Sequence, residues 1–313
     1  MKTNMKPAVY VSGLEKDYAG EHALAGVSFE VSPGCLFGLI GADGAGKTTL
    51  LRILTTLSTF DQGSVEVLGK NVNVDFRYLR NKTGYMPQKF SLYQDLSVKE
   101  NIVFFADVFG VKSGKLKERM EQLLSFSRLT QFANRRSRDL SGGMKQKLAL
   151  SCALIHTPEI IFLDEPTTGV DPVSRREFWD ILSDLKKKGI TIVVSTPYMD
   201  EAQKCDELLF LHHGKIMRKG KPDDLLDAYP YNLFSVKSET NRTISYPQTG
   251  IIPKNLELIY PSEGSLHIAV RDKFSSEETV LSCVKTVLPE ASIIKRITPK
   301  IEDLFIYLLS DTK

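Results

Sequence analysis

The segment GADGAGKT at residues 41–48 decides the fold class of this 313-residue chain. It matches the pattern G-x-x-x-x-G-K-[ST], in which the backbone N–H groups of a glycine-rich loop surround phosphate oxygens. The apolar run 36–40 precedes it and a helix-forming stretch follows it, which is the strand–loop–helix context that the pattern requires. A glycine-rich turn without a ligand is the alternative, and this context disfavours it.

Two side chains of the segment have expected roles in binding a nucleotide. Lys47 is expected to reach the β- and γ-phosphates, and the Thr48 hydroxyl is expected to ligate Mg²⁺. The N-terminus of the helix that follows adds partial positive charge beside the phosphates. The segment therefore predicts a site for a nucleotide phosphate chain and its magnesium ion.

The composition is that of an ordinary globular protein. Hydrophobic residues make up 42% of the chain and charged residues 25%, and the net charge is only +3, which gives little support to a nucleic-acid partner. No run approaches the ~18 apolar residues of a membrane-spanning helix, and the start does not resemble a signal peptide. The four cysteines are far apart in sequence. We therefore expect a soluble, cytoplasmic protein with reduced thiols and two domains.

Short apolar runs alternate with helical stretches up to about residue 220. Runs of this kind suit strands that are buried on both faces, as in a parallel sheet. The fold class that this alternation predicts is α/β, with helices on both faces of the sheet. The expected strands are 36–40, 160–163 and 190–194; the expected helices are 47–57, 115–126, 143–155 and 172–188; and 208–211 with 215–217 form a hairpin.

A change of pattern near Gly220 predicts a second domain over residues 221–313, with an α+β composition. A short helix at 221–229 is expected to open it. Strands at 233–236, 256–260 and 266–270 and helices at 275–288 and 301–309 should follow. The last helix is amphipathic, and we expect it to pack on its own domain rather than to bind a partner directly.

The run IIFLDE at residues 160–165 ends an apolar strand with two carboxylates. Strand ends in open α/β sheets face the ligand crevice. Asp164 suits Mg²⁺ coordination, and Glu165 could act as the general base that polarises an attacking water. A helix N-cap would also explain an acidic strand end, but the phosphate loop favours the catalytic interpretation.

The run LSGGMKQ at residues 140–146 completes a series of motifs. The order of phosphate loop, glutamine, LSGG and acidic strand resembles the ATP-binding subunit of ABC transporters over about residues 8–220. The resemblance implies a P-loop NTPase core at 1–220 with a helical signature subdomain at about 88–156, and an accessory domain at 221–313. It also implies an ATPase whose hydrolysis of ATP energises a membrane exporter, with ATP and Mg²⁺ as cofactors.

The resemblance implies a role for each motif residue. Tyr18 should stack on adenine, and Gln88 should sense Mg²⁺ and take part in catalysis. In the head-to-tail dimer of this family, the LSGG segment of one subunit covers the ATP on the other. The stretch 89–93 suits a coupling helix of the permease, and 169–171 resembles the loop that communicates between sites. The full set expected to bind ATP is Tyr18, Gly41, Asp43, Gly44, Ala45, Gly46, Lys47, Thr48, Thr49, Ser141, Gly142 and Gly143.

One position departs from the family pattern. The family usually has a histidine after the strand that follows the acidic one, and it contacts the γ-phosphate; the corresponding residue here is Pro197. Proline has no polar side-chain atom and no N–H. Since loss of a positioned catalytic group typically costs ~10²–10⁴ in rate, we expect slow hydrolysis but retained ATP binding.

Two assemblies are compatible with Pro197. In the favoured one, the chain forms a heteromer with a second ATPase subunit that keeps its histidine, because the segments 84–93 and 170–176 resemble the first half of tandem ABC-2-type multidrug exporter ATPases. In the other, the chain forms a homodimer with two slow sites. Both require integral membrane permease subunits, which would hold the chain on the inner face of the cell membrane and select the substrate. The alternative functions are a soluble non-transport ABC ATPase and a nucleotide-gated regulatory subunit with weak hydrolysis.

Overall fold

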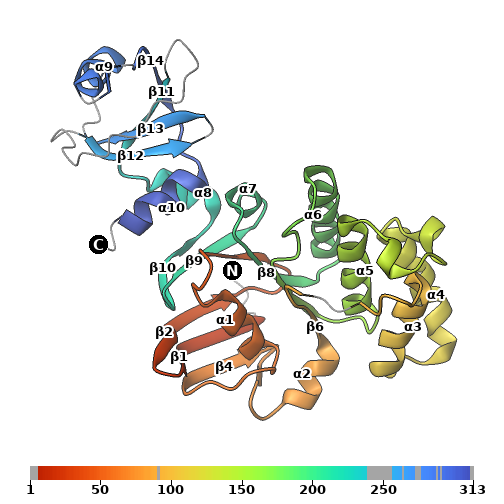
Figure 1. The fold of residues 1–313 in the computed structure, drawn as a ribbon. Helices are drawn as coiled ribbons and strands as arrows, with labels where there is room; N and C mark the ends of the chain where they lie inside the picture. The colour runs from red at the N-terminus through yellow and green to blue at the C-terminus, as the bar shows by residue number, and fades with distance from the viewer. Residues whose placement is uncertain are drawn as a thin grey trace, which may run out of the picture. The chain divides into compact units, whose positions relative to one another are not determined.

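The computed structural model describes residues 6–89, 92–237, 256–262, 264–271, 276–286, 288–289 and 291–310. The chain divides into two compact units, Met1–Pro222 and Asp223–Lys313 (Figure 1). Of the stretch 89–93, which the sequence suggests for a coupling helix, Phe90 and Ser91 lie outside the described residues. Within the described ranges, no helix combines the length and apolar character needed to cross a lipid bilayer.

A six-stranded sheet forms the centre of the first unit. Five of its strands are parallel, and β10 pairs antiparallel at one edge. The predicted strands and the hairpin are confirmed, and β6 is an addition. Every residue of the three central strands is buried, which explains why their sequences are continuous apolar runs. In spatial order the strands are β10 (Lys215–Gly220), β9 (Glu207–His212), β3 (Leu36–Ile40), β8 (Thr191–Thr196), β7 (Ile160–Asp164) and β6 (Thr83–Met86).

A second, antiparallel sheet covers one side of this unit, and the sequence analysis missed it. Its order is β2 (Glu21–Val31), β1 (Val9–Tyr18), β4 (Gln62–Val67) and β5 (Lys70–Asn71). Register shifts between β1 and its neighbours interrupt the alternation of buried and exposed residues. Because a strand is predicted from strict alternation, these irregularities hide it.

Helix α1 (Lys47–Leu54) packs in the apolar core that the two sheets share. Its residues Leu50, Leu51, Ile53 and Leu54 are fully buried. The helix ends earlier than the predicted residue 57. The Thr55 hydroxyl donates to the Leu51 carbonyl at 2.8 Å, and Thr56 has a positive φ of 62°, which an α-helix does not accommodate.

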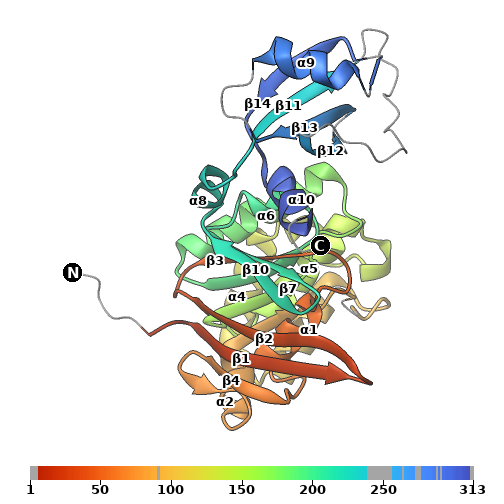
Figure 2. The same ribbon diagram turned by 90° about the vertical axis from the view of Figure 1, so that its left-hand side faces the viewer.

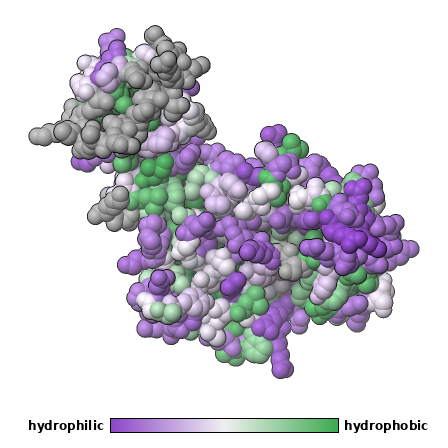
Figure 3. Space-filling view, in the orientation of Figure 1, coloured by the Kyte–Doolittle hydropathy of each residue, from purple (hydrophilic) through white to green (hydrophobic). Residues whose placement is uncertain are grey.

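Helices cover the other face of the six-stranded sheet, as Figure 2 shows for α5 and α6. Helix α5 packs on β6 and α6 packs on β8. The Ser97–Glu100 capping box begins α3, and Asp171 caps α6, whose first residue is a proline. The outer surface near α4 is strongly hydrophilic (Figure 3). The helices of this unit are α2 (Phe76–Lys82), α3 (Val98–Val108), α4 (Ser113–Phe126), α5 (Gly142–Leu154), α6 (Pro172–Lys187) and α7 (Met199–Ala202).

The second unit is an antiparallel sheet with helices, as an α+β domain requires. The strand order is β12 (Leu256–Ser262), β13 (Ser265–Val270), β11 (Asn232–Lys237) and β14 (Ile293–Ile297), of which β14 was not predicted. Alternate residues such as Phe234 and Ile268 join an apolar core with α9 (Glu277–Lys285). The remaining described helices are α8 (Pro222–Asp227) and α10 (Ile301–Ser310).

Helix α10 attaches to this sheet through a buried carboxylate. Asp303 accepts hydrogen bonds from the Tyr260 hydroxyl at 2.7 Å and from the Lys300 N–H at 2.6 Å. Its Oδ1 also lies 2.7 Å from His267 Nδ1. The expectation that the last helix packs on its own domain is therefore confirmed. Burial opposes ionisation of Asp303, but the hydrogen bonds from His267, Lys300 and Tyr260 outweigh it and lower the pKa of this carboxyl.

The Asp303→Asn variant should lower the free energy of unfolding of this unit by about 2 kcal/mol at pH 7, because an amide turns one donor toward the Lys300 N–H. A lowered pKa stabilises the fold above the ordinary value of 3.8, and this contribution is lost as the pH falls through the folded value. The difference between wild type and variant should therefore shrink below about pH 4. Hydrogen exchange of the β13 and α10 amides at several pH values measures this difference in the free energy of unfolding. The same difference at pH 3.5 and pH 7 would contradict the lowered pKa of Asp303.

Candidate nucleotide-binding site

The loop at 41–48 connects β3 to α1, where the sequence predicted a phosphate site. Together with residues of three other segments it lines a pocket of about 410 Å³. The additional residues are Ala23 from β2, Gln88 from the segment after β6, and Glu165 from the segment after β7. Seven of the residues predicted to bind ATP line this pocket, namely Asp43, Gly44, Ala45, Gly46, Lys47, Thr48 and Thr49.

Two glycines give this loop its path. Gly44 and Gly46 have φ values of 78° and 104°, in the region that side chains disfavour. At Gly46 a Cβ atom would also lie 2.5 Å from the Ala23 carbonyl oxygen, whereas at Gly44 it would meet nothing within 4 Å. Gly46 is therefore required by close packing as well as by backbone conformation.

Lys47 is buried and holds the loop closed. Its Nζ donates to the carbonyl oxygens of Gly41 at 2.8 Å and Ala42 at 3.0 Å. It also lies 3.3 Å from Glu165 Oε1, and both side chains are less than a tenth exposed. The Lys47 ammonium group thus balances the charge of the buried Glu165 carboxylate, while its N–H donors stay at the phosphate loop.

Asp164 has one satisfied and one unsatisfied oxygen. Its Oδ1 accepts a hydrogen bond from Ser195 Oγ at 2.8 Å. Its Oδ2 is buried and has no hydrogen-bond partner among the described residues. Burial raises the pKa of this carboxyl, while the hydrogen bond from the Ser195 hydroxyl and the nearby Thr48 hydroxyl act in the opposite direction. A buried carboxylate oxygen without a donor, next to a threonine hydroxyl, fits the oxygen ligands that Mg²⁺ prefers.

Glu165 occupies a strained turn directly after β7. Its φ is +48°, and its N–H donates to Ser195 Oγ at 2.9 Å. Its Oε2 accepts a hydrogen bond from Gln88 Nε2 at 2.9 Å. The two residues predicted as catalytic are therefore in direct contact, although 77 positions separate them in the sequence. A non-glycine residue in this conformation is a strain that functional sites often hold.

Tyr18 is not part of this pocket in the structure. It ends β1, is 47% exposed, and its hydroxyl lies 3.2 Å from Ser58 Oγ. It is not among the residues that line the pocket at the phosphate loop. Its predicted contact with adenine remains a prediction.

The LSGG segment lies at the start of α5, away from the phosphate loop of the same chain. Ser141 caps the helix, and its Oγ accepts a hydrogen bond from the Met144 N–H at 3.3 Å. A Cβ atom on Gly143 would lie 2.4 Å from Ser174 Cβ, so this glycine lets α5 approach the first turn of α6. Gly142 and Gln88 line a different pocket of about 380 Å³. The motif therefore has a structural role beside the expected one toward a second subunit.

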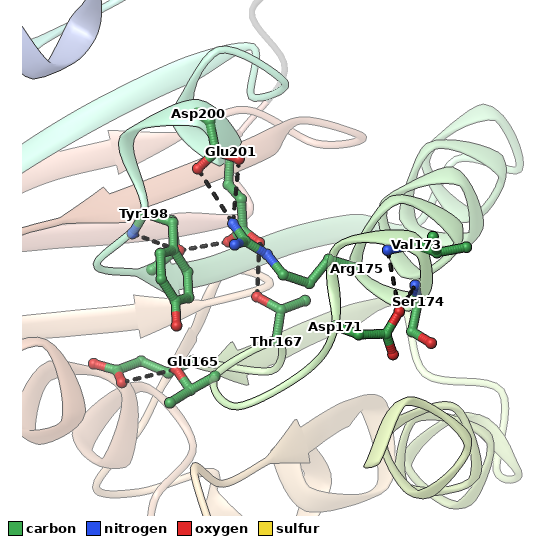
Figure 4. A network of polar contacts seen from close by, with 11 residues as sticks. Glu165, Thr167, Asp171, Val173, Ser174, Arg175, Tyr198, Asp200 and Glu201 are labelled. Atoms are coloured by element: carbon green, nitrogen blue, oxygen red, sulfur yellow. Dashed lines mark hydrogen bonds and ion pairs between the residues drawn. The ribbon is translucent and has the colours of Figure 1, made fainter. Parts of the chain in front are cut away.

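Pro197 lies directly after β8, in a segment whose polar and aromatic contacts the sequence analysis did not predict. Tyr198 follows it, and Figure 4 shows the phenol pointing toward Glu165. The Arg175 guanidinium carbon lies 4.0 Å from the centre of the Tyr198 ring. Ser195, Arg175, Tyr198 and Glu201 gave no signal, because a polar residue in an apolar strand or a charged residue on a helix is common in any sequence.

Similarity to known proteins agrees with these motifs. A family profile described as ABC transporter matches residues 24–168. The Nod factor export ATP-binding protein I of Rhizobium sp. (strain N33) is 40% identical over 225 residues, which cover 72% of this chain and 74% of that protein. The chain belongs to the ABC transporter family. The resemblance inferred from the sequence is confirmed.

Another relative of this ABC protein is about twice as long as the segment that matches this chain. The probable multidrug ABC transporter ATP-binding protein YbhF of Escherichia coli (strain K12) is 37% identical over 307 residues. The match covers 96% of this chain but 52% of that protein, so the chain spans about half the length of this relative.

Solved structures confirm the fold class of the ABC protein. The ATP-binding subunit of an ABC transporter has a TM-score of 0.64 at 29% identity and covers 71% of this chain and 93% of that chain. A dimeric ATP-binding cassette in a post-hydrolysis state, bound to ADP and Pi, has a TM-score of 0.63 at 26% identity, with coverages of 68% and 98%. The α/β P-loop NTPase core predicted from the sequence is therefore confirmed.

The two loop glycines provide a matched test. Gly44→Ala should destabilise the first unit by about 1 kcal/mol through its left-handed φ alone. Gly46→Ala should cost about 3 kcal/mol or more, because the new methyl group also overlaps the Ala23 carbonyl. Thermal unfolding of both variants measures the difference, and equal losses would show that close packing at Gly46 is unimportant.

Proposed function

We propose that this chain is the ATP-binding and ATP-hydrolysing subunit of an ABC-type membrane exporter, with ATP and Mg²⁺ as its cofactors. The observation that carries the proposal is the meeting of Lys47, Gln88, Asp164 and Glu165 from three separate segments around the phosphate loop. The names of the relatives, a multidrug transporter ATP-binding protein and a Nod factor export ATP-binding protein, support export as the process.

ATP binding would change the partner of Lys47. The loop N–H groups and the N-terminus of α1 would hold the phosphates. The ammonium group, which now lies 3.3 Å from Glu165, would turn to the β- and γ-phosphates. Glu165 would then lose its charge partner and become available to a water molecule. The unsatisfied Asp164 oxygen and the Thr48 hydroxyl would hold the metal, which neutralises phosphate charge when bound.

Hydrolysis would use Glu165 as the general base. Its carboxylate would polarise the attacking water, and Gln88, already hydrogen-bonded to it, would keep that carboxylate oriented and take part in binding the metal. Tyr18 would contact the adenine at the edge of the site. The hydrogen bond between Gln88 and Glu165 supports the roles of these two residues, and the resemblance to the family supports the role of Tyr18.

A second subunit would complete the site. Ser141, Gly142 and Gly143 lie away from the phosphate loop of their own chain, so their N–H groups would meet the ATP held by a partner ATPase. Closure of this head-to-tail dimer would drive an integral membrane permease, which would hold the complex on the inner face of the membrane. A heteromer with a histidine-bearing ATPase is the favoured assembly, and a homodimer is the alternative.

Pro197 favours a second candidate function, a nucleotide-gated subunit with weak hydrolysis. ATPase assays with and without a co-expressed permease distinguish the candidate functions, because an exporter subunit should respond to the permease, whereas a nucleotide-gated subunit should hydrolyse ATP weakly in both assays. A non-transport ABC ATPase would hydrolyse ATP at the same rate in both assays.

Lys47→Ala should abolish nucleotide binding, since it removes the cation of the phosphate loop. Glu165→Gln should keep nucleotide binding but lower the rate of hydrolysis at least 100-fold, because the general base is lost. Titration with a fluorescent ATP analogue measures nucleotide binding, and a phosphate-release assay measures the rate of hydrolysis. Thermal unfolding controls for folding. Retained binding in well-folded Lys47→Ala would contradict the proposed role of the loop.

Pro197→His should raise the rate of ATP hydrolysis by tenfold or more, since an imidazole restores a donor at the position where proline has none. Pro197→Ala is the matched control, because it removes the ring and restores the backbone N–H as Pro197→His does but adds no polar side chain, and its rate should stay within about twofold of wild type. Steady-state phosphate release measures all three proteins. Fast wild-type turnover that Pro197→His leaves unchanged would remove the explanation based on the missing histidine.

A further inference from the structure

A buried carboxylate, Glu201, joins three segments beside the nucleotide pocket without lining it. It lies on the short helix α7 and is 1% exposed. Its Oε1 accepts hydrogen bonds from Thr167 Oγ1 at 2.7 Å and Arg175 Nε at 3.0 Å. Its Oε2 accepts one from Thr196 Oγ1 at 2.5 Å. Figure 4 shows the side chains of Thr167 and Arg175 converging on Glu201.

The hydrogen bond with Thr167 connects Glu201 to the turn that carries the proposed general base, Glu165. Thr167 follows Glu165 by two positions in a tight turn, in which the Thr168 N–H donates to the Glu165 carbonyl at 3.2 Å. The next step of that turn is the hydrogen bond from the Val170 N–H to the Thr167 carbonyl at 3.1 Å. Because the turn is tied at Thr167, a shift of Glu201 would move the backbone that sets the direction of the Glu165 side chain.

The hydrogen bond with Arg175 connects Glu201 to the start of α6, which packs against the LSGG segment that would face a second subunit in the proposed dimer. Arg175 lies in the first turn of α6, which Asp171 caps through the N–H groups of Val173 and Ser174. Ser174 in turn lies against Gly143 of the LSGG segment. On its other side Arg175 stacks on Tyr198, the residue after Pro197. Glu201 therefore fixes the general-base turn, the end of β8 and the start of α6 relative to one another.

We propose that Glu201 is a positioning residue for ATP hydrolysis, which holds the Glu165 turn in register with the α6 start and with the segment that carries Pro197 and Tyr198. The proposal rests on the proposed ATPase function. A carboxylate is suited to this position, because its two oxygens accept hydrogen bonds from two hydroxyls and a guanidinium at the same time. Its charge also balances that of the half-buried Arg175.

Asp200 provides a matched control. It precedes Glu201 and pairs with the same Arg175, whose Nη2 lies 3.2 Å from both of its carboxylate oxygens. It is, however, 75% exposed and contacts neither threonine. Removing its charge should therefore weaken only a solvent-exposed pair.

The experiment compares wild type with Glu201→Gln and Asp200→Asn as purified full-length chains. Glu201→Gln should lower kcat at least tenfold with the KM for ATP and the affinity for a fluorescent ATP analogue within twofold. Asp200→Asn should stay within twofold in all three quantities. Single-turnover phosphate release extends the comparison to slow rates. If Glu201→Gln does not fold, Thr167→Val, which keeps the side-chain shape, carries the test and should lower kcat without changing KM.

The single tryptophan provides a readout that does not depend on hydrolysis. Trp179 is buried on α6, one turn after Arg175. ATP should change its fluorescence in wild type and in Asp200→Asn, and should change it less in nucleotide-bound Glu201→Gln. The proposal is overturned if Glu201→Gln matches Asp200→Asn in kcat and fluorescence, or if it loses ATP affinity in proportion to kcat. A wild-type chain that does not bind ATP contradicts the proposed function instead.

Discussion

The buried ion pair between Lys47 and Glu165 is the constraint on which the rest of the first unit depends. A carboxylate and an ammonium group can be buried together only if both are paired and hydrogen-bonded. The ammonium is satisfied by the carbonyl oxygens of the phosphate loop, and the carboxylate by Gln88. These partners follow the carboxyl ends of β3, β6 and β7. The parallel sheet must therefore bring the carboxyl ends of these three strands to one edge before the pair can form.

This pair also explains why the site can respond to a nucleotide. A phosphate chain is a stronger partner for Lys47 than a single carboxylate, because it presents more charge and more acceptor oxygens. In the proposed mechanism, Glu165 would lose its cation when Lys47 turns to the phosphates, and it would then accept a hydrogen bond from the attacking water. The same two residues would therefore stabilise the site without nucleotide and prepare it for proton transfer once nucleotide is bound.

The sequence predicted the parts of the fold whose local pattern is strong. The buried strands β3, β7 and β8 are apolar runs, and the phosphate loop is a spaced motif, so both were placed correctly. The antiparallel sheet was missed, because register shifts in β1 break the alternation. Ser195 and Glu201 were missed for a different reason. Their importance lies in contacts with residues 30 or more positions away, such as Glu165 and Thr167, which no local pattern encodes.

The contacts around Pro197 separate the loss of a chemical group from any loss of structure. Proline removes an N–H and fixes φ, but the neighbouring residues keep their hydrogen bonds: the Tyr198 N–H donates to Thr196 Oγ1 at 3.1 Å, and the Thr196 hydroxyl donates to Glu201. All the polar anchors of the segment are therefore in place without a histidine. A side chain restored at residue 197 would add a donor to a framework that is already complete, so its effect should fall on the rate of hydrolysis and leave the fold unchanged.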